Sequence, residues 1–219
     1  MTPADLQVAR QFHDARARLA RLSPAEAAPA LREMAQRVRH DDLHMIYRAG
    51  LGHLGGDFSV TDILVTLYAG VLNVDPLHPL SAQRDRLVLS KGHTAGALYA
   101  TLARCGFFAH CELETFAAPE SAFNGHPNRT KVPGVETSTG PLGHGFPVAV
   151  GIALSARLQA LAVAPSGTTD DTVIESGAKQ PPGTPSMPSE RQHLRRLACR
   201  SGPARVAAYR PVASTPTVR

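Results

Sequence analysis

The chain has 219 residues, of which 43% are hydrophobic and 19% are charged, and its formal net charge is +5. This length suits one ordinary globular domain with a sizeable core. The basic residues are scattered, with no zinc-finger spacing and no RNA-binding signature, so the composition argues against a nucleic-acid-binding protein and favours phosphorylated ligands.

The first elements in chain order are two helices. Apolar residues recur at helical spacing through residues 1–23, which predicts one helix there. Ser23, Pro24 and Glu26 then form the start signal of a second helix: a capping serine, a proline at the first helical position and a glutamate at the third. This second helix is expected to reach Ala49 and to end at Gly50.

The middle of the chain alternates between helical and strand-like segments. Residues 60–72, 95–105 and 146–161 are apolar enough to predict helices, and Gly106 closes the second of them. Residues 85–90 form a short apolar run bounded by polar residues, which predicts a buried strand. The alternation predicts an α/β fold in which a parallel sheet is flanked by helices.

The last part of the chain differs in composition. Pro, Ser, Thr and Arg dominate it from about residue 164, and apolar periodicity disappears. Such a segment buries too little apolar surface to offset its ordering entropy, so it is expected to be disordered apart from a short helix around residues 190–199. Three regions follow: an N-terminal helical segment at 1–30, the main domain at 31–161, and a tail at 162–219.

The compartment is predicted from what the sequence lacks. Three cysteines do not make a disulfide framework, which is typical of a reducing environment. No apolar leader begins the chain and no apolar run is long enough to span a bilayer. The expectation is a cytoplasmic protein with no membrane partner.

Histidines are concentrated in the main domain. Three of them follow a glycine, namely His53, His93 and His126, and His144 follows another. A glycine lets the backbone approach a ligand while the neighbouring imidazole exchanges a proton. Any one of these could be an ordinary structural histidine, but four such pairs in one stretch favour a binding or catalytic site.

A glycine-rich loop precedes the last predicted helix. Its sequence is GPLGHG at residues 140–145, and its backbone N–H groups could face an anion at the start of that helix. Its spacing differs from the dinucleotide-binding fingerprint. Gly-rich turns before helices are common, so the loop alone indicates little.

Four motifs in order carry a more specific signal. They are GHLGG at 52–56, DRLVLSKGH at 85–93, NGHP at 124–127 and GVETSTGPLG at 134–143. Over residues 31–160 the chain resembles the transketolase family. It resembles most closely the short type, in which the diphosphate-binding and pyrimidine-binding halves are separate subunits. The resemblance implies an incomplete thiamine-diphosphate-binding fold.

The resemblance also implies an activity and partners. Transketolases use thiamine diphosphate and Mg²⁺ to pass a two-carbon ketol unit from one sugar phosphate to another. Imidazoles that titrate near neutral pH suit the proton transfers of this chemistry. The implied partners are a second copy of the chain and a pyrimidine-binding subunit.

Site residues follow from the same resemblance. His53 and His126 would contact the ketol end of the substrate, and His93 would lie by the cofactor diphosphate and the active centre. The thiazolium and diphosphate would rest on the loop that contains Gly140, Pro141, Leu142 and Gly143, with His144 beside it where many members carry Gln.

The family pattern breaks near residue 161. Members continue with a strand and a Gly-Asp-Gly motif, whose Asp holds the metal together with a later Asn, and this chain contains no Gly-Asp-Gly. Hard cations need such oxygen ligands. Asp170 and Asp171 follow no apolar strand, so no metal ligand is assigned. Either a reading-frame shift or a fusion to a different tail would explain why the family pattern stops near residue 161.

Two main interpretations result, and a third belongs to another class. The chain is either the diphosphate-binding subunit of a two-chain transketolase or a non-catalytic remnant of that subunit type. The third interpretation is a basic phosphate- or nucleic-acid-binding protein. The missing Gly-Asp-Gly motif favours the remnant for this chain, while the four motifs favour a transketolase ancestry.

Overall fold

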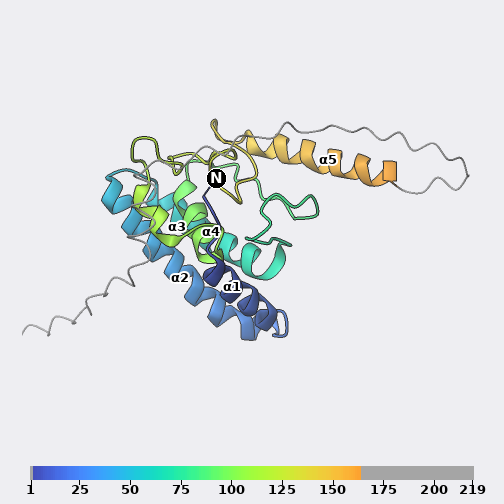
Figure 1. Cartoon of the computed structure of the whole chain (residues 1–219), viewed down its shortest axis with the longest axis horizontal. Coiled ribbons are helices and arrows are strands. Elements are labelled where there is room, and N and C mark those ends of the chain that lie inside the picture. The colour runs from blue at the N-terminus through green and yellow to red at the C-terminus, as the bar shows by residue number, and fades with distance from the viewer. Residues whose placement is uncertain (1, 164–219) are drawn as a thin grey trace, which may run out of the picture. The chain divides into compact units, whose positions relative to one another are not determined.

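The computed structural model describes residues 2–163, which form helices joined by long irregular segments (Figure 1). The helices in chain order are α1 (Leu6–Leu19), α2 (Pro24–Ala49), α3 (Leu54–Thr66), the π-helical turn η1 (Leu67–Val71), α4 (Ala95–Cys105), the 3₁₀ turn η2 (His110–Thr115) and α5 (Gly145–Val163). In the described part of the chain, no helix is long and apolar enough to cross a membrane.

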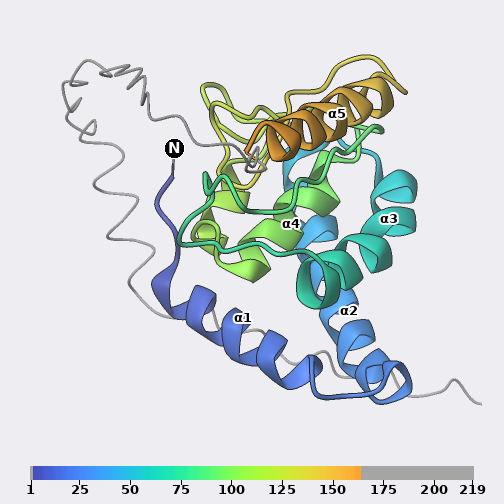
Figure 2. The same ribbon diagram turned by 90° about the vertical axis from the view of Figure 1, so that its right-hand side faces the viewer.

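Helix α4 is the centre of the core. It packs against α1, α2 and α3, and all of its residues except Arg104 are buried (Figures 1 and 2). Small residues allow this close packing, since Ala and Gly alternate with larger apolar side chains along the helix. Phe108 and Phe123 extend the same core beyond the helix, with ring centroids 4.7 Å apart.

The predicted helix ends are confirmed where a local signal marked them. Ser23 and Glu26 form the capping box of α2, and Gly50 ends that helix in the left-handed conformation with φ of +67°. Gly106 ends α4 in the same way with φ of +91°. Each signal acts within a few residues, so the sequence was sufficient to predict it.

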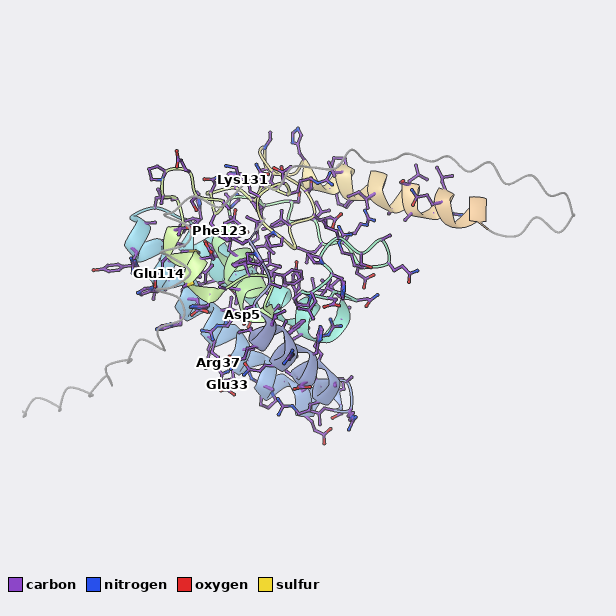
Figure 3. The ribbon with its side chains drawn as sticks, viewed as in Figure 1. Asp5, Glu33, Arg37, Glu114, Phe123 and Lys131 are labelled. Atoms are coloured by element: carbon purple, nitrogen blue, oxygen red, sulfur yellow. The ribbon has the colours of Figure 1, made fainter. Side chains whose placement is uncertain are left out.

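The N-terminal segment is anchored to the core. The Asp5 side chain accepts hydrogen bonds from the first turn of α1, and its backbone N–H donates to the Gly106 carbonyl at 3.0 Å (Figure 3). Arg16 donates to the carbonyl oxygens of Leu72 and Val74, just after η1. On the outer surface, Glu33 and Arg37 pair one turn apart along α2 (Figure 3).

Two predicted elements differ from the structure. The helix expected at 60–72 begins six residues earlier, at Leu54, and finishes as η1. The run at 85–90, predicted as a buried strand, carries no strand pairing, and residues 2–163 contain no strand. A parallel strand exists only beside a neighbour, so the parallel sheet stays a prediction. Residues 164–219 of the predicted tail, with its short helix, lie outside the described residues.

Candidate functional site

His53 and His93 face each other although they lie 40 positions apart in the sequence. Their ring centroids are 5.1 Å apart, and the rings meet edge to face at 64°. His53 is the residue before α3, and His93 lies two residues before α4. The packing of α3 against α4 brings these two loops, and with them the imidazoles, together.

His126 joins this pair through Thr139 and Gly92. Nδ1 of His126 lies 3.0 Å from the hydroxyl oxygen of Thr139. A Cβ added to Gly92 would lie only 1.9 Å from that same oxygen, so Thr139 packs directly on the Gly92 backbone. The contacts therefore run from His126 through Thr139 and Gly92 to His93 and His53.

The glycine-rich loop lies against the segment that leads to His93. The N–H of Gly143, where φ is +87°, donates to the Ser90 carbonyl at 3.3 Å. A Cβ on Gly145 would be 2.7 Å from Cα of Ser90. Leu142 and His144 are exposed on the same loop, at the start of α5. The four sequence motifs thus meet around residues 88–93.

Lys91 connects the first two motifs. Its ammonium group donates to the Gly56 carbonyl at 3.1 Å and to the Ser59 hydroxyl at 2.8 Å. The cation therefore holds the first turn of α3 against the loop before α4. No local pattern signals this role, because the groups that Lys91 contacts lie more than 30 positions away in the sequence.

Glu136 has a structural role in the stretch before the glycine-rich loop. Its carboxylate accepts hydrogen bonds from Arg84 at 2.6 Å and from Arg86 at 3.4 Å. These bonds fix the two segments that carry Thr139 and His93 side by side. Glu136 is thus part of an ion-paired support for the site.

Asp57 is a buried carboxyl group beside the imidazole pair. Only 1% of the residue is exposed, and Oδ1 accepts a hydrogen bond from the N–H of Ala97 at 3.2 Å. Burial raises the pKa of Asp57, while the Ala97 N–H and the nearby His53 and His93 oppose that shift. Sequence reasoning missed this residue, because nothing local shows that the first turn of α3 packs under α4.

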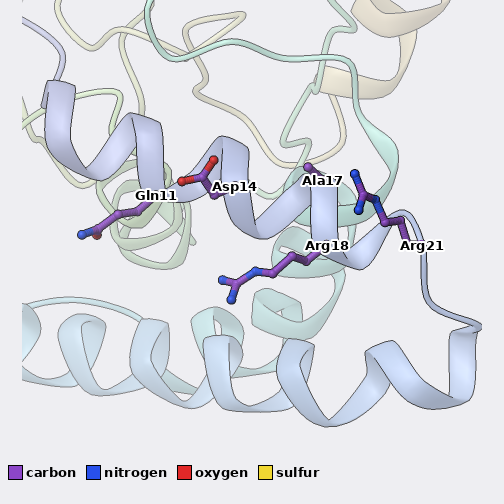
Figure 4. Close-up of a pocket in the computed structure, with 5 residues that line it drawn as sticks. All are labelled: Gln11, Asp14, Ala17, Arg18 and Arg21. Carbon is purple, nitrogen blue, oxygen red and sulfur yellow. The ribbon is translucent and has the colours of Figure 1, made fainter.

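A hollow on the surface of α1 is separate from these residues. It is lined by Gln11, Asp14, Ala17, Arg18 and Arg21, all on α1 or just after it (Figure 4). None of the three converging imidazoles borders it. It therefore belongs to no part of the candidate site.

Within the described residues, no cluster of charged or sulfur-bearing side chains stands out as a site for a divalent metal ion. No group of three or more His, Cys, Asp or Glu side chains within residues 2–163 is arranged to hold one. Asp170 and Asp171 lie outside the described residues. The donors around the glycine-rich loop are backbone N–H groups and imidazoles, which suit an anion or a neutral ligand rather than a hard cation.

A known protein family matches most of the chain. The family described as "Transketolase, thiamine diphosphate binding domain" matches residues 31–175. This range begins where the main domain was predicted to begin and extends beyond its predicted end at residue 161. The family domain thus includes every residue of the candidate site.

Curated relatives include proteins that are named as transketolase subunits. One subunit of the apulose-4-phosphate transketolase of Actinobacillus succinogenes is 47% identical over 106 residues, which are 48% of this chain and 38% of that one. The 6-deoxy-6-sulfo-D-fructose transketolase subunit SqwG of a Clostridium species is 40% identical over 131 residues, which are 60% of this chain and 48% of that one. The chain spans less than half the length of these relatives.

Solved transketolase structures are also similar to this chain. The transketolase from Leishmania mexicana aligns with a TM-score of 0.55 and 31% identity over 57% of this chain and 19% of that one. A Pichia stipitis transketolase in complex with sedoheptulose 7-phosphate aligns with a TM-score of 0.53 and 30% identity over 60% of this chain and 19% of that one.

Proposed function

Since the chain belongs to the transketolase family, through its thiamine diphosphate binding domain, we propose that it forms the diphosphate-binding side of a ketol-transferring enzyme. The reaction moves a two-carbon ketol unit between sugar phosphates. A separate pyrimidine-binding subunit completes the active site, and two such pairs assemble through a second copy of the chain. The names of the relatives, which are themselves subunits, support the two-chain arrangement.

One observation carries this proposal. His53, His93 and His126 come from three separate motifs, yet they are linked by the ring contact and by the packing of Thr139 on Gly92. Ketol transfer requires proton donors and acceptors around two adjacent substrate oxygens. A group of imidazoles beside a glycine-rich loop has the composition for that task.

The residues act as follows. Thiamine diphosphate, when bound, supplies the nucleophilic carbon and accepts the electron pair of the broken C–C bond. His53 and His126 bind the C1 and C2 oxygens of the ketol and exchange protons with them. Thr139 orients the His126 ring through its hydroxyl group. His93 lies next to His53, and residues 140–144 would hold the cofactor.

The names of the relatives suggest a substrate class for this chain. One relative is named for apulose 4-phosphate and another for 6-deoxy-6-sulfo-D-fructose. Both names describe ketoses with an anionic group away from the ketol end. We expect this chain to act on a ketose of that class, with a sugar phosphate as the first choice.

A second candidate is a non-catalytic remnant. The sequence has no Gly-Asp-Gly, and residues 2–163 contain no group of three or more His, Cys, Asp or Glu side chains that could hold a metal ion. A chain that keeps the imidazole cluster but cannot hold the diphosphate would not catalyse transfer. No step of the proposed reaction is therefore assigned to a metal ligand of this chain.

Activity in the two-chain mixture tests the proposal. The full chain is combined with a pyrimidine-binding transketolase subunit, thiamine diphosphate, Mg²⁺, a ketose phosphate and an aldose phosphate. We expect mass spectrometry to show an aldose lengthened by two carbons only when both chains are present. His126→Ala should lower kcat/KM by about 10²- to 10⁴-fold, the range for loss of a general acid or base.

The matched control is His78→Ala. His78 pairs with Asp75 on the surface, away from the three imidazoles, so this variant should retain full activity. Equal activity of His126→Ala and the unmodified chain would contradict the site. No transfer by the mixture would favour the remnant.

A further inference from the structure

Asp42 is a buried carboxyl group without a hydrogen-bond partner among the described residues. It lies on α2, it is 0% exposed, and neither of its carboxyl oxygens has a hydrogen-bond partner among the described residues. Its Oδ1 packs on Gly96, where an added Cβ would be 2.1 Å away. A buried, unpaired carboxylate is strongly unfavourable, so this group requires a physical explanation.

Asp57 approaches the same turn from α3. Its Oδ1 accepts the N–H of Ala97, the residue after Gly96, and its own N–H donates to the His53 carbonyl at 2.9 Å. The first turn of α4 therefore has one buried carboxyl group from α2 and another from α3. His93 lies just before this turn, and His53 lies just before α3.

We propose that Asp42 and Asp57 together hold one proton and one negative charge at the first turn of α4, and that this charge state keeps His53 and His93 in contact. The proton is on Asp42 and the charge is on Asp57. The importance of this pair for ketol transfer rests on the proposed function, whereas the charge state of the pair does not.

The assignment follows from the surroundings of each group. Asp57 has an N–H donor at the start of a helix and the two imidazoles beside it, and all of these stabilise a negative charge. Asp42 has none of these. Its burial, followed by the charges of Asp57 and Asp41, raises the pKa of Asp42 to about 8.

The other charged groups near Asp42 are already engaged. Asp41, its neighbour on α2, accepts two hydrogen bonds from Arg104 of α4 and lies 3.0 Å from His110 of η2. The Arg104 guanidinium therefore neutralises Asp41 rather than Asp42. Asp57 on α3, with its imidazole neighbours His53 and His93, is then the larger of the two carboxylate charges that act on Asp42.

The proton on Asp42 makes folding depend on pH. An unfolded Asp loses its proton near pH 3.9, whereas folded Asp42 keeps its proton to about pH 8. Between those values the folded chain binds one more proton than the unfolded chain, so stability falls as the pH rises. Above about pH 8, two negative charges face one helical turn.

Equilibrium urea unfolding of the full chain from pH 5 to pH 9 provides the test. As the pH rises toward 8, Asp42 should lower the folding equilibrium constant by up to about tenfold per pH unit. Asp42→Asn should remove that contribution. Asp57→Asn keeps the shape of the side chain but removes its charge. Because that charge raises the pKa of Asp42, the fall in stability should end at a lower pH in this variant. Asp14→Asn, an exposed residue on α1, is the matched control.

Two measurements on the unmodified chain keep the proposal testable if a variant does not fold. Infrared spectra at pH 7 should contain the carbonyl band of a protonated carboxylic acid, and that band should disappear above about pH 8. A nuclear Overhauser contact between the His53 and His93 rings should weaken over the same range. No such band, or an Asp42→Asn variant with an unchanged pH dependence, would overturn the proposal even if ketol transfer is confirmed.

Discussion

Replacing Gly92 with alanine is expected to destabilise the chain by about 2 to 3 kcal/mol, the upper range for overpacking in a tightly packed site. The new Cβ would lie 1.9 Å from Oγ1 and 2.3 Å from Cβ of Thr139. The Cβ of Thr139 cannot move without its backbone, which is bonded through its N–H to the Pro127 carbonyl. The clash therefore separates the segment that carries His126 from the segment that carries His93.

Urea unfolding with two matched variants checks this expectation. Gly55 lies on α3 with open space around the position of a Cβ, so Gly55→Ala should leave stability unchanged or raise it by up to about 1 kcal/mol. Adding Thr139→Gly to Gly92→Ala should recover part of the lost stability, because the clashing atoms are removed. A Gly92→Ala chain as stable as the unmodified one would show that Thr139 does not pack on this glycine.

The chain alone is expected not to bind thiamine diphosphate at micromolar concentrations. Binding of that strength needs about 8 kcal/mol. In the transketolase family the diphosphate is held through a metal ion, and this chain lacks the Gly-Asp-Gly motif whose Asp binds that ion. The carboxylate that activates the pyrimidine ring belongs, in this family, to the pyrimidine-binding partner chain. The backbone N–H groups of the glycine-rich loop do not replace a divalent cation.

Calorimetric titration of the full chain with thiamine diphosphate, with and without Mg²⁺, measures this directly. The expected result is no saturable heat in either case, and the same result with Leu142→Ala, which removes an exposed apolar contact from the loop. Magnesium-dependent micromolar binding by this chain alone would disprove the expectation. It would also direct attention to Asp170 and Asp171 as metal ligands.

Helices with local signals were predictable, whereas packing between helices was not. The capping box at Ser23 and the terminal glycines Gly50 and Gly106 act within one helical turn, so the sequence displays them. The early start of α3 was missed because glycines such as those after His53 are more typical of a loop. In the structure that turn is held by Lys91, which is 35 positions away from Gly56.

The candidate site was predictable only where motifs contained it. The Gly-His pairs pointed to His53, His93 and His126, and the contacts through Thr139 connect them. The sequence did not indicate Asp42 and Asp57 as site residues, because no local pattern distinguishes an Asp that will be buried from one that will be exposed to solvent. Their meeting at the first turn of α4 depends on three helices, which no local pattern encodes.

Histidine NMR spectra of the two-chain complex test most directly whether the three imidazoles form one side of a cofactor site. Only this chain is labelled, and thiamine diphosphate with Mg²⁺ is added stepwise. The account predicts that ring signals of His53, His93 and His126 shift together with one dissociation constant, while those of His13 and His78 stay unchanged. Shifts confined to other histidines, or different dissociation constants for the three, would contradict a single shared site.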